Sequence, residues 1–160
     1  MSQQKIYSDD PLVHYKNSAV NPERTKAEID GVLAEWQVTD VYWHWNPQAN
    51  DIYVMFKINE TIKGVPLKVS VRIDCPIVWD KARSRRRPYT LEQVNLRISM
   101  RAMWWYIKTH LEMAYVTHSS KTVAFLPNIA GVREGQTLKD IIIPRLVDIQ
   151  NLVALEEKQI

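Results

Sequence analysis

Two stretches of the chain place a strongly apolar residue at every second position, and this period of two constrains the fold more than any other feature. The first covers residues 52–58 and the second residues 67–73. Such alternation is typical of antiparallel strands with one buried face and one solvated face. The short segment around residues 60–64 predicts a hairpin between them. Residues 38–45, rich in β-branched and aromatic side chains, are predicted to form a third strand.

Helices are predicted on both sides of these strands. Asn21 is a favourable N-cap and Pro22 suits the first helical position, which predicts a helix over residues 22–36. Thr90 and Gln93 match a capping box, which predicts a second helix to about residue 116. Apolar residues cover much of its girth, so we expect it to pack on the sheet and on a second partner. A last helix is expected over residues 137–155, interrupted near Pro144.

These elements predict a single-domain α+β fold. We expect a three-stranded, or four-stranded, antiparallel sheet with helices packed on one face, in the order α-β-β-β-α-α. Residues 1–20 are expected to be irregular or to form an edge strand. Residues 22–118 would form the α-β-β-β-α core, and residues 119–160 a C-terminal helical segment. With 160 residues, of which 46% are hydrophobic, the chain suffices for one core.

Composition argues against several classes of protein. No uninterrupted run of about 18 apolar residues exists, so we expect no membrane-spanning segment. The polar N-terminal region does not match a secretory signal. The single cysteine, Cys75, excludes an internal disulfide framework and a cysteine-rich zinc site. These features predict a cytoplasmic protein with no membrane partner.

Positive charge is concentrated in residues 81–108, which contain eight of the 21 Lys and Arg residues but a single acid, Glu92. Arginine pairs with phosphate through two hydrogen bonds, and an aromatic ring can stack on a base. We therefore interpret the segment as a nucleic-acid-binding surface. Its predicted members are Lys81, Arg83, Arg85, Arg86, Arg87, Arg97, Arg101, Trp105 and Lys108. The alternative interpretation is a solvated or intersubunit basic loop.

Strand alternation predicts a second candidate surface. Tyr42 and His44 fall on one face of their strand, and Trp43 and Trp45 fall on the other. If helices cover only one side of the sheet, one of these faces is exposed. An exposed face with Tyr42, His44 and Tyr53 would resemble the stacking platforms of single-strand-binding proteins. Further members of that face would be Lys57, Lys68 and Arg72. The alternative is that these aromatic residues only favour the β conformation and have no role in binding.

Catalysis has little support in the sequence. The four histidines are scattered, and no HExxH, GxSxG or CxxC pattern occurs. Cys75 is interpreted as structural, because no histidine lies near it in the sequence. We therefore expect no catalytic residue, no cofactor and no metal site. A metal-dependent nuclease is the third hypothesis, after the two given below. Its candidate ligands are Asp9, Asp10, Asp74, Asp80 and Glu92.

Five short motifs follow one another along most of the chain. They are N-P-E-R-T-K-A-E-I at residues 21–29, V-M-F at 54–56, the helix over 101–112, F-L-P-N-I at 125–129 and G-Q-T-L at 135–138. In order and spacing they resemble a widespread uncharacterised family of small phage proteins. That resemblance implies expression inside a host cell and implies no activity. The Gly135-Gln136-Thr137 segment differs from the Asp-Gly-Arg-Thr turn typical of that family.

These observations lead to one expected function and an alternative. We expect a non-enzymatic, homo-oligomeric protein that binds nucleic acid, DNA rather than RNA, in phage replication or recombination in the host cytoplasm. The alternative is a protein-interaction factor that uses exposed aromatic residues to act on a host enzyme or defence system. The element order also resembles those of double-stranded-RNA-binding modules and single-strand annealing proteins, although order alone is weak evidence for function.

Overall fold

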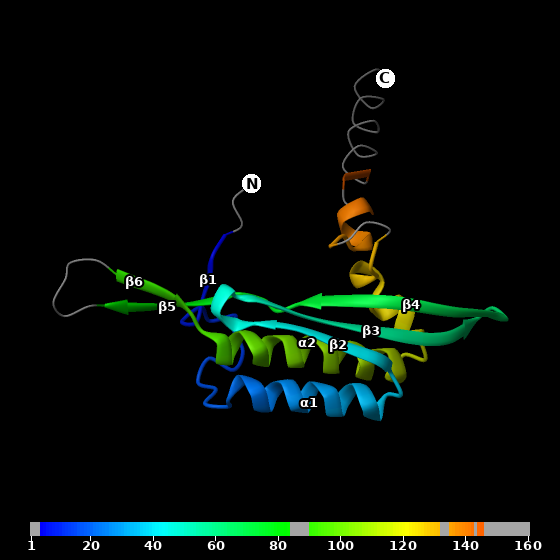
Figure 1. Cartoon of the computed structure of the whole chain (residues 1–160), viewed down its shortest axis with the longest axis horizontal. Helices are drawn as coiled ribbons and strands as arrows, with labels where there is room; N and C mark the ends of the chain where they lie inside the picture. The colour runs from blue at the N-terminus through cyan, green and yellow to red at the C-terminus, as the bar shows by residue number, and fades with distance from the viewer. Residues whose placement is uncertain (1–3, 84–89, 132–134, 143, 146–160) are drawn as a thin grey trace, which may run out of the picture.

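The computed structural model describes residues 4–83, 90–131, 135–142 and 144–145. They form an α+β fold with two three-stranded sheets, which confirms the predicted fold class (Figure 1). The elements are, in chain order, β1 (Ile6–Tyr7), α1 (Pro22–Glu35), β2 (Thr39–Asn46), the 3₁₀ turn η1 (Pro47–Ala49), β3 (Asp51–Ile62), β4 (Val65–Asp74), β5 (Val78–Arg83), β6 (Thr90–Val94), α2 (Leu96–Val116), α3 (Lys121–Ala124) and the 3₁₀ turn η2 (Leu126–Asn128).

The main sheet has the order β2-β3-β4, and all its pairings are antiparallel. The predicted hairpin is present between β3 and β4. Only Lys63 and Gly64 separate the two strands, with φ angles of 50° and 77°. Two successive residues with positive φ are typical of a type I′ turn, whose twist matches that of the flanking strands. Glycine suits this position because it lacks the Cβ that disfavours positive φ.

The sequence predicts no strand in residues 75–94, but the structure has a second sheet with strands from this segment. Part of that segment is β5, which pairs antiparallel with β6 and parallel with β1. The capping box at Thr90 was also wrong, because Thr90 begins β6. Instead, α2 begins after Asn95, whose side chain accepts a hydrogen bond from the Ile98 N–H. The strands β5 and β6 carry many polar residues and lack the apolar alternation of β3 and β4, so periodicity could not reveal them.

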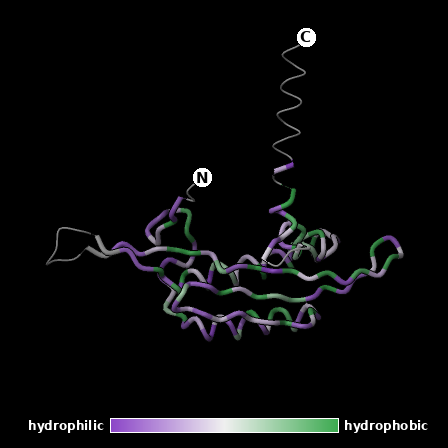
Figure 2. Tube along the Cα trace, turned by 45° about the horizontal axis from the view of Figure 1, so that its top comes forward, coloured by the Kyte–Doolittle hydropathy of each residue, from purple (hydrophilic) through white to green (hydrophobic). Residues whose placement is uncertain are grey.

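Both long helices cover the same face of the main sheet (Figure 1). Alternate residues of β3 are buried against them, including Val54 and Phe56. Ile29 of α1 and Met103 of α2 are fully buried in the same cluster. Phe56 also meets Phe125 edge-on, with 5.5 Å between the ring centroids. Hydrophobic and hydrophilic residues accordingly alternate in short stretches along the chain (Figure 2).

The apolar residues of α2 fall into two stripes along the helix, and one of them faces the core. It contains Met100, Met103, Ile107, Leu111 and Ala114, all buried. The other stripe includes Trp105, which is 43% exposed. The second partner of α2 within the described chain is α1, which packs beside it (Figure 1). None of the described helices is both long enough and apolar enough to cross a membrane.

The segment after α2 returns to the edge of β4. Glu60 of β3 accepts hydrogen bonds from the Ser120 hydroxyl and from the backbone N–H groups of Lys121 and Thr122, at 2.6–3.0 Å. The Ala130 N–H then donates to the Ser70 carbonyl at 2.8 Å. Residues 138–142 are helical, as predicted, and residues 146–155 of the predicted last helix lie outside the described residues.

We expect Phe56→Ala to lower the free energy of unfolding by about 3–5 kcal/mol, because the ring is 1% exposed and its loss leaves a cavity. Urea titration followed by circular dichroism measures the change. Leu12→Ala is the matched control, since Leu12 is 85% exposed and should change stability by less than about 0.5 kcal/mol. Equal effects of the two substitutions would contradict this packing.

Candidate nucleic-acid interface

The strands β5 and β6 form a two-stranded ribbon that extends beyond the ends of α1 and α2 (Figure 1). Lys81 pairs with Glu92 across the ribbon, and Arg83 pairs with Thr90 at its described end. Residues 84–89 join the two strands, so Arg85, Arg86 and Arg87 belong to this connection but lie outside the described residues. The ribbon thus brings Lys81 and Arg83 onto one projecting element.

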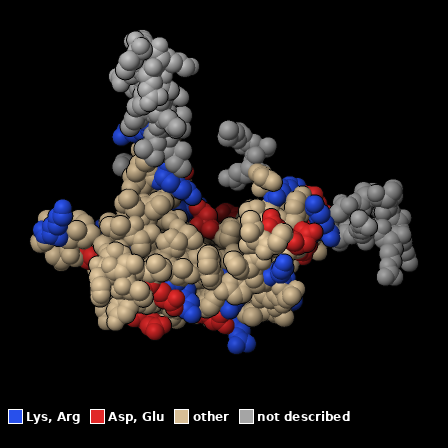
Figure 3. Space-filling model, turned by 180° about the vertical axis from the view of Figure 1, so that it is seen from behind, with Lys and Arg blue, Asp and Glu red and all other residues tan. Residues whose placement is uncertain are grey.

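Charge at the base of the ribbon is balanced. Glu92 accepts hydrogen bonds from Lys5 and from the Tyr7 hydroxyl, at 2.5 and 2.8 Å. The hydrogen bond from Lys5 contributes most to lowering the pKa of Glu92, and the hydrogen bond from Tyr7 contributes next. The Lys81 ammonium lies 3.7 Å from the centre of the Tyr7 ring. Lysine and arginine atoms gather beside acidic ones near the described end of the ribbon, rather than forming one basic face (Figure 3).

A hydrogen-bond network attaches the ribbon to α2. Asp80 of β5 accepts hydrogen bonds from the Ser8 hydroxyl and from the Asn95 side-chain amide. Asn95 is also the N-cap of α2. The buried Ser99 hydroxyl accepts from the Val78 N–H at 3.0 Å. Because these contacts join β1, β5 and the first turn of α2, they set the direction in which the ribbon leaves the body.

The helical members of the predicted surface have other roles. Arg101 is only 13% exposed and forms an ion pair with Glu28 of α1, so we exclude it from the candidate site. Its guanidinium also lies 4.3 Å from a ring centre of Trp104. Trp105 packs on His14, with 5.6 Å between ring centroids. Lys108 lies 3.6 Å from Glu112. Arg97 is exposed in the first turn of α2.

The predicted stacking face exists on the side of the main sheet away from the helices. Cross-strand pairing aligns His44 of β2 with Tyr53 of β3, and their rings stack with centroids 4.8 Å apart and planes 11° apart. The Arg72 guanidinium of β4 lies 3.8 Å from the centre of the Tyr53 ring. Tyr42 lies on the same face and is 57% exposed. Three strands therefore contribute planar side chains to one surface.

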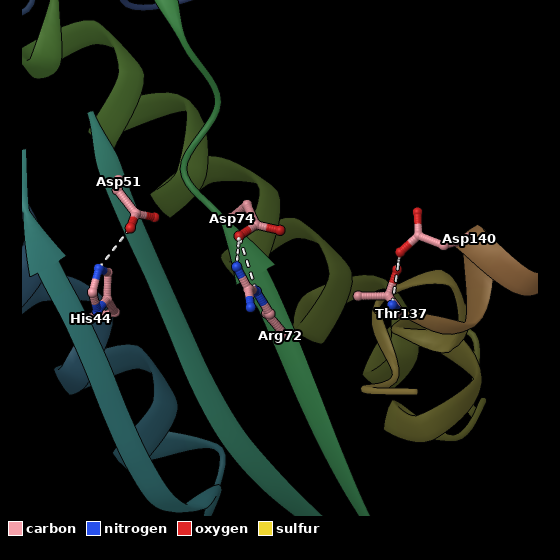
Figure 4. Close-up of polar contacts among 6 residues, drawn as sticks. All are labelled: His44, Asp51, Arg72, Asp74, Thr137 and Asp140. Carbon is pink, nitrogen blue, oxygen red and sulfur yellow. Dashed lines mark hydrogen bonds and ion pairs between the residues drawn. The ribbon is translucent and has the colours of Figure 1, made fainter. Parts of the chain in front are cut away.

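The cations of this face are paired with acids. His44 contacts Asp51 at 2.8 Å, and Arg72 donates to Asp74 at 2.9 Å (Figure 4). Lys57 and Lys68 both lie near Asp40. The surface that the sequence analysis described as basic and aromatic is therefore aromatic with nearly balanced charge.

An open groove of about 670 Å³ lies where β4 ends and where β1 and β5 begin. Asp74, at the end of β4, lines one part of it, and Lys5 and Trp79 line another. Ile6 and Ile77 supply exposed apolar surface within it. Sequence reasoning missed this groove because its walls come from segments about 70 residues apart, which only the parallel pairing of β1 with β5 brings together.

The carboxylates proposed for a metal-dependent nuclease lie apart. Asp74 is paired with Arg72, Asp80 with Ser8 and Asn95, and Glu92 with Lys5 and Tyr7. Among the described residues, no three His, Cys, Asp or Glu side chains lie close enough to hold a metal ion. The structure therefore lends this hypothesis no geometric support, and we do not develop it further.

Comparison with known proteins identifies no relative: no family model, no curated protein and no solved structure matches this chain. The resemblance to a family of small phage proteins therefore stays a prediction, and the function has to be inferred from these surfaces.

The ion pair between Glu28 and Arg101 gives stability a predictable pH dependence. The hydrogen bond from Arg101 lowers the pKa of Glu28, although partial burial opposes it. A lowered folded-state pKa adds stability above the unfolded pKa, and this is lost as pH falls through the folded-state value. We expect thermal unfolding to show a larger decrease in Tm from neutral pH to about pH 3 for the native protein than for Glu28→Gln.

The matched control for this measurement is Glu112→Gln, which removes an exposed carboxylate paired with Lys108. Exposed ion pairs contribute little to stability, so this variant should follow the native pH profile. A Glu28→Gln profile that also coincides with the native one would contradict the assignment.

We expect the Cys75 thiol to be unreactive in the folded protein. Burial, together with the neighbouring charge of Asp74, raises its pKa to about 12, and the thiolate is the reactive form. Iodoacetamide at about pH 8 should alkylate Cys75 only after unfolding in urea, as followed by mass spectrometry. Rapid alkylation of the folded protein would contradict this structural role.

Proposed function

We propose that the protein binds nucleic acid, without catalysing a reaction on it, through the outer part of the β5–β6 ribbon. The observation that carries the proposal is the projection of this ribbon from the body, with Arg83 at its described end. Arginine side chains pair with phosphates through two hydrogen bonds, whatever the sequence of the bases.

The distribution of acids along the ribbon supports this orientation. At its base, Glu92 balances Lys5. Beyond the Lys81–Glu92 pair, residues 82–91 contain no acid and four arginines. Positive charge therefore increases towards the segment that joins the strands. A locally positive element attracts a polyanion even though the net charge of the whole chain is only +3.

The finer parts of the proposal rest on the sequence. The resemblance to small phage proteins supports the host cytoplasm as the location. DNA as the partner and replication or recombination as the process belong to the proposal as expectations from the basic segment of the sequence. Action as a homo-oligomer belongs to the same proposal, because several ribbons on one strand would raise affinity through multivalency.

The test is a salt titration of binding to fluorescently labelled single- and double-stranded DNA and RNA, read by anisotropy. We expect Arg85→Gln/Arg86→Gln/Arg87→Gln to weaken binding. We also expect it to flatten the dependence of log K on log salt concentration by up to roughly 0.9 per lost phosphate contact on duplex DNA. The reason is that each neutralised phosphate releases counterions.

The matched control removes the same charge elsewhere. Lys16, Lys63 and Lys139 are exposed, and none is in an ion pair with another described residue. Lys16→Gln/Lys63→Gln/Lys139→Gln should nearly keep the native salt dependence. Equal losses in both triple variants would indicate attraction by net charge alone. Absence of binding by the native protein at low salt would overturn the proposal and favour the protein-interaction alternative.

A further inference from the structure

We infer that the open face of the main sheet is a second, base-stacking contact, and that the ligand is therefore a single strand with unpaired bases. The inference rests on the proposed function, since it names the kind of nucleic acid and the path that it follows from the ribbon. Bases inside a duplex stack on each other and do not offer their faces to a protein, so this surface would select against duplexes.

The planar groups on this face supply the first argument. Tyr42 is 57% exposed and stacks on no other described ring. Tyr53 is flanked by His44 from β2 and by Arg72 from β4. The Arg72 side chain is 21% exposed and stays paired with Asp74, so a base that stacks on Tyr53 has to displace its guanidinium from the ring.

Continuity with the ribbon supplies the second argument. Val78 is buried beneath α2, so strand alternation turns Trp79 and Lys81 to the opposite side of β5. Asp74, which pairs with Arg72 on the open face, and Trp79 both line the 670 Å³ groove. A strand held by the ribbon can therefore pass Trp79 and reach Tyr53 along one side of the molecule.

The third argument is that the open face and the ribbon differ in net charge. On the open face, Arg72 and the two lysines near Asp40 are already paired with acids. Phosphates gain little there, so affinity at this face comes from stacking, which is sequence-tolerant and does not depend on counterion release. On the ribbon, arginines outnumber acids, so affinity comes from phosphates. The two surfaces should therefore respond differently to salt.

The experiment measures binding of labelled oligothymidylate and of a duplex of the same length over a salt series. We expect Tyr42→Leu and Tyr53→Leu each to weaken oligothymidylate binding by about ten-fold, the usual scale of one lost base–aromatic stack. The salt dependence and the affinity for duplex should stay as in the native protein. Tyr115→Leu is the matched control, because Tyr115 is 71% exposed at the far end of α2 and should change neither.

The outcomes separate the inference from the proposed function. If both tyrosine variants bind oligothymidylate as tightly as the native protein, while the ribbon variant is weakened, the inference fails and the proposed function stands. Equal losses for single strand and duplex would also overturn it. If the native protein binds neither probe, both the inference and the proposed function are overturned. Tyr42→Leu keeps the test decisive should Tyr53→Leu unfold, since Tyr42 is largely exposed; circular dichroism checks the fold of each variant.

Discussion

One-sided burial of the main sheet is the constraint on which the rest of the structure depends. Both long helices cover the same face, where Val54 and Phe56 of β3 meet Met103 of α2. Burial of apolar area is the main favourable contribution to folding, and here it is concentrated on one side. Neither α1 nor α2 covers the opposite face (Figure 1). Its aromatic residues, Tyr42 and Tyr53, are therefore available for contacts that the core does not require.

The fold pairs some of the charged residues of the basic segment with acids, so the positive surface of the molecule is smaller than the sequence suggests. Arg101 belongs to the basic segment in the sequence, yet it joins α1 to α2 through Glu28. Lys81 contacts Tyr7 beside Glu92, so the base of the ribbon is internally balanced. Net positive charge is left for the outer ribbon. A charged residue can attract a ligand only when the fold has not already paired it, because intramolecular partners compete for the same interaction.

The two candidate surfaces have complementary physical properties. Attraction between the basic ribbon and a polyanion acts over a Debye length and is weakened by salt. Stacking on Tyr42 and Tyr53 acts only at contact and tolerates any base. In our proposal, the ribbon therefore captures the nucleic acid and the open face distinguishes unpaired from paired bases. In the same proposal, one strand touches both surfaces by running along the groove that Asp74 and Trp79 line.

The sequence alone determined the α+β class, the β3–β4 hairpin, the start of α1 and the shared face of Tyr42 and His44. Each is encoded by local periodicity or by caps and turns, which act over a few residues. Only the tertiary structure decided the rest: the ribbon, the groove and the pairing of Arg101. These features depend on contacts between segments far apart in the chain, such as β1 with β5 and α1 with α2, and no local pattern records such contacts.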